Sequence, residues 1–195
     1  PYTTLFRSSI KRIEEQTDGK QMSISSYRYS GDRTVLSYEE MNGYCNRAIK
    51  LNPNCKLTLI LMQVNDMEDY MKNEGSGFVQ DLLQSVQDTV RRHVGHRGIV
   101  CPLQPNLMSV VVQDINSDIK LRAFIESLRS RIAWNYRLID PKYEISFSFG
   151  VACYPENGMD MRIVHRKLVK ALQMAQEKHA NCYVIYKEHL HGELS

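Results

Sequence analysis

Apolar and polar residues follow two different periods along this chain, and these periods predict where its helices and strands lie. The continuous apolar run at residues 55–64 is typical of a strand buried on both faces. In residues 78–93 and 117–136, apolar side chains return every three or four positions, which is the spacing of one helix face. Two further apolar runs flank a short polar turn and predict a β-hairpin with strands at 99–103 and 107–113.

The other segments complete an alternation of helices and strands. Ser37, with Glu40 three residues later, forms a capping-box pattern that predicts the start of a helix. The remaining predicted elements are helices at 37–51, 66–74 and 160–178, and strands at 145–152 and 183–186. In chain order this gives helix, strand, helix, helix, strand, strand, helix, strand, helix, strand, which is a mixed α/β pattern.

Composition is that of an ordinary soluble globular domain. Of the 195 residues, 43% are hydrophobic and 24% are charged, and the net charge of +3 is too small to indicate a nucleic-acid partner. No apolar run reaches the roughly eighteen residues of a membrane span, and no N-terminal signal pattern is present. The five cysteines are scattered without a metal or disulfide spacing, so we expect reduced thiols and a cytoplasmic location.

Three separated motifs carry a resemblance to a known family. Residues 146–158 read S-F-S-F-G-V-A-C-Y-P-E-N-G, which resembles the S-I-G-V-A-x-Y-P-x-x-G signature of GGDEF domains, the diguanylate cyclase family. Residues 41–49, M-N-G-Y-C-N-R-A-I, are similar to the segment that opens these domains, and residues 171–186 to the segment that closes them. The resemblance implies the palm-like, ferredoxin-related GGDEF fold, an α/β (α+β) domain whose central, mostly antiparallel sheet is flanked by helices.

The resemblance also divides the chain. It implies a GGDEF-like domain at residues 37–186, preceded by an N-terminal connector at 1–36 and followed by a C-terminal connector at 187–195 to a missing domain. Residues 1–8 read P-Y-T-T-L-F-R-S, like a translated sequencing adaptor, and we expect them to be non-native. The chain is therefore expected to be a piece of a longer protein.

The hairpin tip is where this sequence departs from the family. The five positions of the family's G-G-D/E-E-F motif fall on residues 104–108, Q-P-N-L-M. Magnesium ions that bridge nucleotide phosphates prefer carboxylate ligands, and the resemblance places those ligands at Gln63, Asn65 and Leu107. An amide oxygen brings no charge and a leucine offers no ligand. We therefore expect no catalytic residue, no metal site and no cofactor.

Other positions of the family's GTP pocket are changed as well. The resemblance places its guanine-contacting residues at Met71 and Gln80, and its late phosphate-contacting residues at Gln176 and Ala180. The family's product-inhibition motif falls near residues 95–98, which read G-H-R-G. The degenerate nucleotide pocket that the resemblance implies consists of Gln63, Asn65, Met71, Gln80, Gln104, Pro105, Asn106 and Leu107.

These changes lead to a first hypothesis about function. We expect a domain that is not an enzyme: a catalytically inactive, regulatory GGDEF-like domain of a bacterial cyclic-di-GMP signalling protein. Its partner would be a neighbouring domain, with an EAL phosphodiesterase as the candidate, or a second copy in a homodimer. The alternative is a sensor that binds GTP weakly without hydrolysing it. An active diguanylate cyclase, or a diverged nucleotide cyclase that uses Asp66 and Glu68, is the least favoured hypothesis.

Two surface features have more than one interpretation. The basic cluster at residues 91–97 fits a phosphate-binding site, but it also fits a solvated helix end whose cations interact favourably with the helix dipole. Trp134 and Tyr136 fit an interface anchor, but equally a helix end packed on the core. Neither feature decides the function from the sequence alone.

Overall fold

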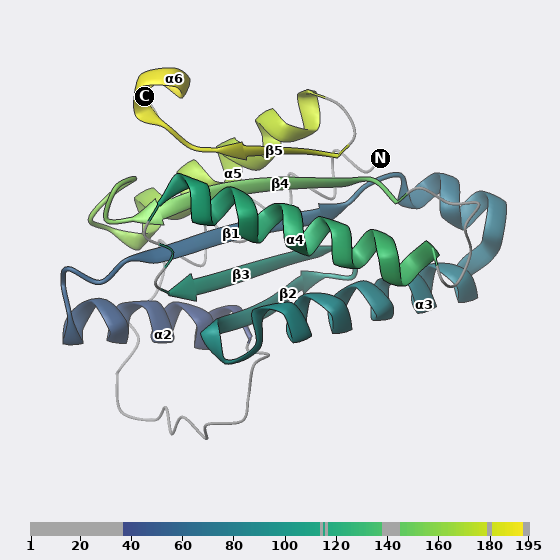
Figure 1. Ribbon diagram of the computed structural model, residues 1–195, viewed down its shortest axis with the longest axis horizontal. Coiled ribbons are helices and arrows are strands. Elements are labelled where there is room, and N and C mark those ends of the chain that lie inside the picture. The colour runs from purple at the N-terminus through teal and green to yellow at the C-terminus, as the bar shows by residue number, and fades with distance from the viewer. Residues whose placement is uncertain (1–36, 114, 116, 138–144, 179–180, 193–195) are drawn as a thin grey trace.

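The structure is a computed structural model that describes residues 37–113, 115, 117–137, 145–178 and 181–192. The expected adaptor scar and N-terminal connector, as well as Ala180, lie outside these residues. Helices surround one central sheet, and the segment that follows the last strand lies at one end of the molecule (Figure 1). The predicted mixed α/β architecture is therefore confirmed.

The sheet has five strands in the order β2-β3-β1-β4-β5. The strands are β1 (Leu57–Val64), β2 (Gly98–Gln104), β3 (Leu107–Gln113), β4 (Phe147–Tyr154) and β5 (Cys182–Ile185). The central strand β1 pairs antiparallel with both β3 and β4, and β2 pairs antiparallel with β3. Because only β5 pairs parallel, with β4, the sheet is mostly antiparallel, as predicted.

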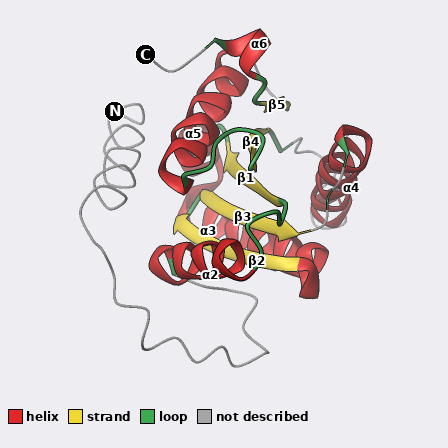
Figure 2. Ribbon diagram, turned by 90° about the vertical axis from the view of Figure 1, so that its left-hand side faces the viewer, coloured by secondary structure: helices red, strands yellow, loops and turns green. Residues whose placement is uncertain are grey.

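Helices cover both faces of the sheet (Figure 2). They are α2 (Tyr38–Leu51), α3 (Met67–Val94), the 3₁₀ turn η2 (Gly95–Arg97), α4 (Asp118–Arg137), α5 (Met161–Glu177) and α6 (Glu188–His191). Side chains alternate along β1: Ile60 and Met62 join the core under α3 and α4, whereas Leu59 and Leu61 join the core under α2 and α5. The two layers explain why this strand is apolar at nearly every position.

The predicted helix boundaries agree with the structure except at the C-terminus. Ser37 caps α2 through the expected capping box, in which its Oγ accepts from the Glu40 amide at 3.3 Å and its own amide donates to Glu40 Oε2 at 2.8 Å. The two helices predicted at 66–74 and 78–93 are both present within the span of α3, and the non-helical Gly75 (φ 87°, ψ 175°) separates them. Helix α6 was not predicted.

The most recognisable motif of the sequence is structural. A Cβ at Gly150 would lie 2.4 Å from the backbone nitrogen of Leu172 and 2.6 Å from the carbonyl oxygen of Leu168, so this glycine lets α5 pack directly on β4. The buried Asn157 side chain closes the turn after β4, since its Oδ1 accepts from the Cys153 amide at 2.7 Å. Its Nδ2 donates to the Tyr186 carbonyl at 3.3 Å, which ties the turn to the end of β5.

Candidate functional site

The hairpin tip lies against the end of β1. In the strand pairing Gln63 faces Leu107. One residue further, the Val64 amide donates to the Asn106 carbonyl at 2.9 Å, and Asn106 Nδ2 donates to the Val64 carbonyl at 3.2 Å. The structure therefore brings together Gln63, Asn106 and Leu107 from the predicted pocket.

Leu107 is a core residue. Its side chain is 1% exposed and packs in the cluster under α2 and α5. A buried leucine contributes apolar contacts at this position and has no lone pair to offer a metal. The nearly continuous apolar run of β3 could have identified it as core from the sequence.

The side chain of Gln63 forms a hydrogen bond with a residue of helix α5. Its Oε1 accepts a hydrogen bond of 2.7 Å from Gln176 Nε2, near the end of α5. Gln176 occupies the position that the family resemblance assigns to a phosphate contact. The two amides therefore join β1 to α5 across 113 positions of sequence.

Asn65 is held by two serines of the neighbouring strand region. Its Nδ2 donates to Ser146 Oγ at 2.9 Å and to Ser148 Oγ at 3.0 Å, and its amide donates to the Ser146 carbonyl at 2.9 Å. Both serines are buried. The sequence analysis missed these partners, although the alternation of serine with phenylalanine in this motif places both serines on one face.

Of the other predicted pocket residues, Gln104 is half-buried and Met71, Gln80 and Pro105 are exposed. Gln104 pairs with Leu107 across the hairpin turn, and the carbonyl of the exposed Pro105 accepts from Gln87 Nε2 of α3 at 3.5 Å. Met71 and Gln80 are exposed on α3, on either side of the bend at Gly75. No hydrogen bond or ion pair given by the structure joins them to the hairpin residues.

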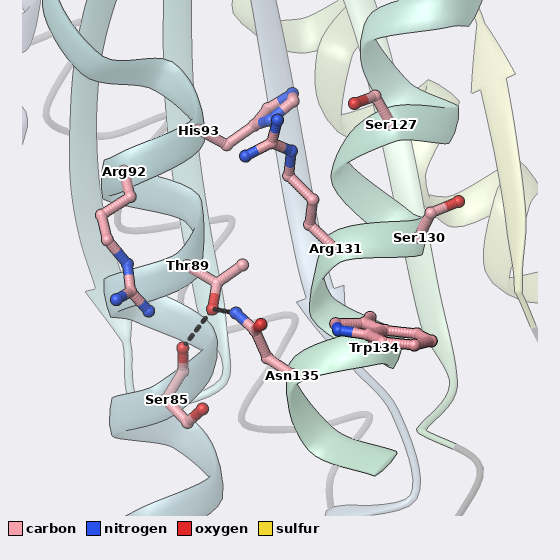
Figure 3. Close-up of a pocket in the computed structure, with 9 residues that line it drawn as sticks. All are labelled: Ser85, Thr89, Arg92, His93, Ser127, Ser130, Arg131, Trp134 and Asn135. Carbon is pink, nitrogen blue, oxygen red and sulfur yellow. Dashed lines mark hydrogen bonds between the residues drawn. The ribbon is translucent and has the colours of Figure 1, made fainter. Parts of the chain in front are cut away.

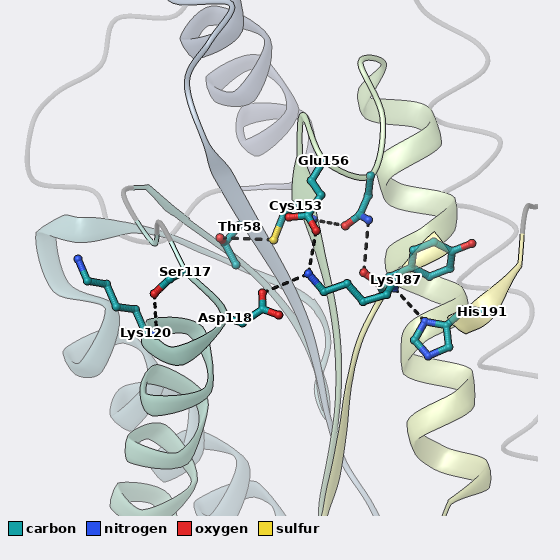
Figure 4. Close-up of polar contacts among 10 residues, drawn as sticks. Thr58, Ser117, Asp118, Lys120, Cys153, Glu156, Lys187 and His191 are labelled. Carbon is teal, nitrogen blue, oxygen red and sulfur yellow. Dashed lines mark hydrogen bonds and ion pairs between the residues drawn. The ribbon is translucent and has the colours of Figure 1, made fainter. Parts of the chain in front are cut away.

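Two further features were not predicted from the sequence. Lys187, two residues after the end of β5, forms ion pairs with Glu156 at 2.7 Å and with Asp118 at 3.1 Å (Figure 4). A groove between α3 and α4 has a volume of about 740 Å³ and is lined by residues of both helices (Figure 3). No hydrophobic period of the sequence predicts the ion pairs of Lys187. The groove could not be predicted because it depends on how α3 and α4 pack against each other.

Comparison with known proteins identifies the family. Residues 38–182 match the family described as "Diguanylate cyclase, GGDEF domain". This match spans most of the chain, and the protein therefore belongs to the GGDEF family. No curated protein sequence matches the chain. Among the residues that the structure describes, no helix is both long enough and apolar enough to cross a membrane.

Solved structures share the fold at low sequence identity. The active GGEEF domain of a diguanylate cyclase from Vibrio cholerae has a TM-score of 0.68 at 13% identity, covering 80% of this chain and 99% of that one. A diguanylate cyclase/phosphodiesterase from Caldicellulosiruptor saccharolyticus has a TM-score of 0.64 at 19% identity, covering 78% and 89%. An EAL/GGDEF domain protein from M. capsulatus has a TM-score of 0.60 at 16% identity, covering 74% and 96%.

The family assignment corrects one prediction. The sequence analysis concluded that the chain is not an enzyme, because acidic residues are missing from the hairpin and from β1. That conclusion is wrong, since the matching family is that of diguanylate cyclase and the similar structures include a domain described as active. The substitutions at single positions do not remove the chain from an enzyme family.

The residues at the predicted metal positions nevertheless do not fit a magnesium ion. Gln63 Oε1 already accepts from Gln176, and Asn65 Oδ1 accepts from Ser148 Oγ at 3.3 Å. Leu107 is buried in the core. Within the described ranges, no group of three or more His, Cys, Asp and Glu side chains is placed to hold a metal ion, and this includes the exposed Asp66 and Glu68. We therefore derive no step through a metal at these residues.

Proposed function

We propose that this chain is a regulatory and interaction domain of a bacterial cyclic-di-GMP signalling protein. The GGDEF family supplies the context. Two of the similar structures come from proteins named as EAL/GGDEF and as diguanylate cyclase/phosphodiesterase. They support an EAL-class phosphodiesterase as the neighbouring domain. The proposal places the domain in the cytoplasm, where a reducing environment keeps scattered cysteines as thiols.

The observation that carries this proposal is the use of the hairpin site for internal bonding. Gln63 and Gln176 bind each other, and Asn65 binds Ser146 and Ser148. A hydrogen bond between partly buried amides stabilises a fold by about 1 kcal/mol net. The polar side chains at the strand ends thus hold strands and a helix together, which favours a role as a rigid body that contacts other domains.

The connection beyond β5 supports the interaction role. Lys167 Nζ forms an ion pair of 2.6 Å with Glu188, and Lys170 Nζ donates to the His191 carbonyl at 2.8 Å. Lys187 binds Asp118 and Glu156, on α4 and on the turn after β4. Figure 4 shows the two ion pairs of Lys187. Together with the contacts of Lys167 and Lys170 they fix the direction in which the chain leaves the sheet. A segment that leaves the sheet in a fixed direction can couple the position of this domain to that of the next.

The test uses the longer protein that carries this chain and its neighbouring domain. We compare phosphodiesterase activity on cyclic-di-GMP in the wild type, in Lys187→Met and in Lys56→Met, an exposed control lysine before β1. We expect Lys187→Met to change the activity by about fivefold or more, the lower end of ordinary coupling free energies. Equal activities in all three proteins would contradict the regulatory role.

GTP binding is a second candidate function. Gln63 and Asn65 at the end of β1, and Gln176 near the end of α5, are half-buried, and the side-chain amides of Gln63 and Gln176 bind each other. If GTP displaced their internal bonds, these groups could act as neutral donors and acceptors for a base or phosphate. Isothermal calorimetry with GTP tests this, with Gln63→Ala as the site variant and the exposed Gln173→Ala as the control. No heat at millimolar GTP would exclude this function.

A further inference from the structure

The short helix α6 contains a histidine whose side chain bonds to the start of the helix. The backbone amide of Lys187, the residue before α6, donates to His191 Nδ1 at 2.9 Å (Figure 4). In the opposite direction, the His191 amide donates to the Lys187 carbonyl at 2.9 Å. A helix of four residues is too short to be stable by itself, so these two bonds across one turn contribute much to keeping it formed.

The bond to the imidazole depends on the protonation state of the ring. A backbone N–H group can only donate, so His191 Nδ1 accepts and the proton of the neutral ring lies on Nε2. When the ring binds a second proton, both of its nitrogens become donors. The Lys187 amide then faces an N–H group, and the bond is lost.

The charged and titratable groups around His191 are mainly basic. Besides Lys187 they are Lys167, Lys170, Lys178, Tyr186, Glu188 and His189. The carboxylate of this set, that of Glu188, is already paired with Lys167 at 2.6 Å. Burial lowers the pKa of the His191 ring most, followed by the positive charges of Lys178, Lys170 and His189. A second proton on this ring is therefore disfavoured while α6 is formed.

The imidazole is oriented by an aromatic residue next to the sheet. The centroid of the His191 ring lies 5.4 Å from that of Tyr186, which is fully buried directly after β5. The Tyr186 hydroxyl donates to the carbonyl of Gly192, the residue after α6. One buried tyrosine thus contacts both the histidine and the end of the helix, and it holds the ring where Nδ1 accepts from Lys187.

The side chain of Lys187 is anchored independently of the imidazole. It forms ion pairs with Glu156 at 2.7 Å and with Asp118 at 3.1 Å. These ion pairs keep Lys187 attached to α4 and to the turn after β4 when His191 changes its charge. A loss of the bond to the imidazole therefore releases the residues that follow Lys187 and leaves the sheet intact.

From this geometry we propose that α6 is a pH-sensitive latch on the segment that follows the sheet. The latch is closed while His191 is neutral and accepts from the Lys187 amide, and it opens when the imidazole binds a proton. The open segment binds this proton near the ordinary pKa of 6.5, whereas the closed segment resists it. Opening therefore becomes more favourable as the pH falls below 6.5, by up to about tenfold for each pH unit.

The latch is a property of this chain alone. It goes beyond the proposed function, because it adds a signal, acidification, to a segment that is otherwise fixed. It requires no neighbouring domain, and its test measures only the opening of α6. A failure of the latch is therefore distinguishable from a failure of the regulatory role.

The experiment measures hydrogen exchange at the Lys187 amide by NMR between about pH 7.5 and about pH 5. Exchange rates are divided by those of an unstructured chain at each pH, so that only opening is compared. We expect the protection of Lys187 to fall by about tenfold or more over this range. The amide of Ile60 in the central strand β1 should stay better protected than Lys187 throughout, which shows that the domain remains folded while α6 opens.

Two substitutions separate the titration of His191 from its packing. In His191→Asn, the side-chain amide oxygen replaces Nδ1 as an acceptor that does not titrate. In His191→Phe, the ring contact with Tyr186 is kept and the acceptor is lost. We expect the protection of Lys187 to be nearly independent of pH in both variants, and low in the phenylalanine variant. The matched control is His189→Asn, at an exposed position of the same helix, which should keep the pH dependence of the wild type.

A second measurement follows the imidazole itself. The nitrogen resonances of the His191 ring show which nitrogen carries the proton. We expect Nε2 to carry it in the neutral ring, and the ring to bind its second proton below pH 6.5, together with the loss of protection at Lys187. Three outcomes would overturn the proposal: a neutral ring protonated at Nδ1, a Lys187 amide without protection near neutral pH, or the same pH dependence in the wild type and in His191→Asn.

Discussion

Gln63 on β1 and Gln176 on α5 are joined by a hydrogen bond of 2.7 Å between their side-chain amides. The family resemblance assigns one of these positions to a metal ligand and the other to a phosphate contact. Here the two side chains satisfy each other. The pair therefore converts two positions associated with substrate chemistry into a contact between the sheet and a helix.

This pair should be measurable as a coupling free energy. We expect Gln63→Ala and Gln176→Ala each to lower the free energy of unfolding by about 1 kcal/mol, and the double variant to lose less than the sum by about 0.5–1 kcal/mol. Urea unfolding measures all three. Gln173→Ala, at an exposed position of the same helix, is the control. Strict additivity would show that the bond does not contribute.

Leu107 should behave as a core residue. Leu107→Ala removes a side chain that is 1% exposed, and we expect it to lower the free energy of unfolding by about 2–5 kcal/mol through lost burial and a residual cavity. The matched control is Leu51→Ala, whose side chain is 81% exposed and whose loss should cost less than about 0.5 kcal/mol. Similar small losses in both variants would place Leu107 at the surface, as a ligand position requires.

The ion pairs of Lys187 should make stability sensitive to alkaline pH. The hydrogen bond to Glu156, followed by that to Asp118, raises the pKa of Lys187 above its ordinary 10.5. A raised pKa contributes stability that is present below 10.5 and is lost as the pH rises through the folded-state value. We expect Lys187→Met to be less stable by about 1 kcal/mol at pH 8, the scale of partly exposed ion pairs in a network.

The difference between wild type and Lys187→Met should then shrink as the pH rises above 10.5 and through the raised folded-state pKa of Lys187, where the wild-type lysine loses its proton. Chemical denaturation at a series of pH values measures it. The exposed Lys56→Met variant should follow the wild type throughout. A constant difference up to strongly alkaline pH would show that methionine acts through packing and that the charge is not involved.

His165 should make the fold sensitive to acid. Burial lowers the pKa of this imidazole, which is 4% exposed and whose Nδ1 lies 2.8 Å from the Met161 carbonyl. The unfolded chain takes up a proton near pH 6.5 while the folded chain does not, so stability is lost as the pH falls below that value. The slope from one such proton reaches about 1.4 kcal/mol per pH unit.

We expect His165→Phe to remove this part of the acid sensitivity between pH 7 and about pH 5. The aromatic ring keeps the edge contact with Tyr38, whose centroid lies 5.7 Å away. Urea unfolding across this range measures the slopes, and His189→Phe, at an exposed position of α6, should keep the wild-type slope. The interpretation is wrong if the His165 variant and the wild type lose stability in parallel.

The sequence contains most of the fold because periodicity records burial. The apolar run of β1, the turn of the hairpin and the helical spacing of α4 each reflect a local pattern that the core requires. Helix α6 was missed, because four residues carry no period and are held by Lys167 and Lys170 from α5. The break between the helices predicted at 66–74 and 78–93 is confirmed, because Gly75 is non-helical within the span of α3.

The site was harder to predict than the fold. Position-by-position comparison with the family suggested which residues stand at the hairpin, but not what they contact. The partner of Gln63 lies 113 residues away, and such a contact appears only after folding. Absent acids also gave a wrong conclusion about enzyme class, because family membership depends on the whole domain. For the groove between α3 and α4, the sequence offered only the basic cluster at residues 91–97 and Trp134 as signals. Each of these had two interpretations.

The central position of β1 limits how this domain can vary in length. Its residues pair on one edge with β3 and on the other with β4, so that Gln63 lies between Leu107 and Ser148. Inserting one residue within β1 would turn every later side chain toward the opposite helical layer. It would also shift the register of the end of β1 relative to both β3 and β4. Insertions and deletions in relatives should therefore accumulate in the connecting loops and leave this strand at constant length.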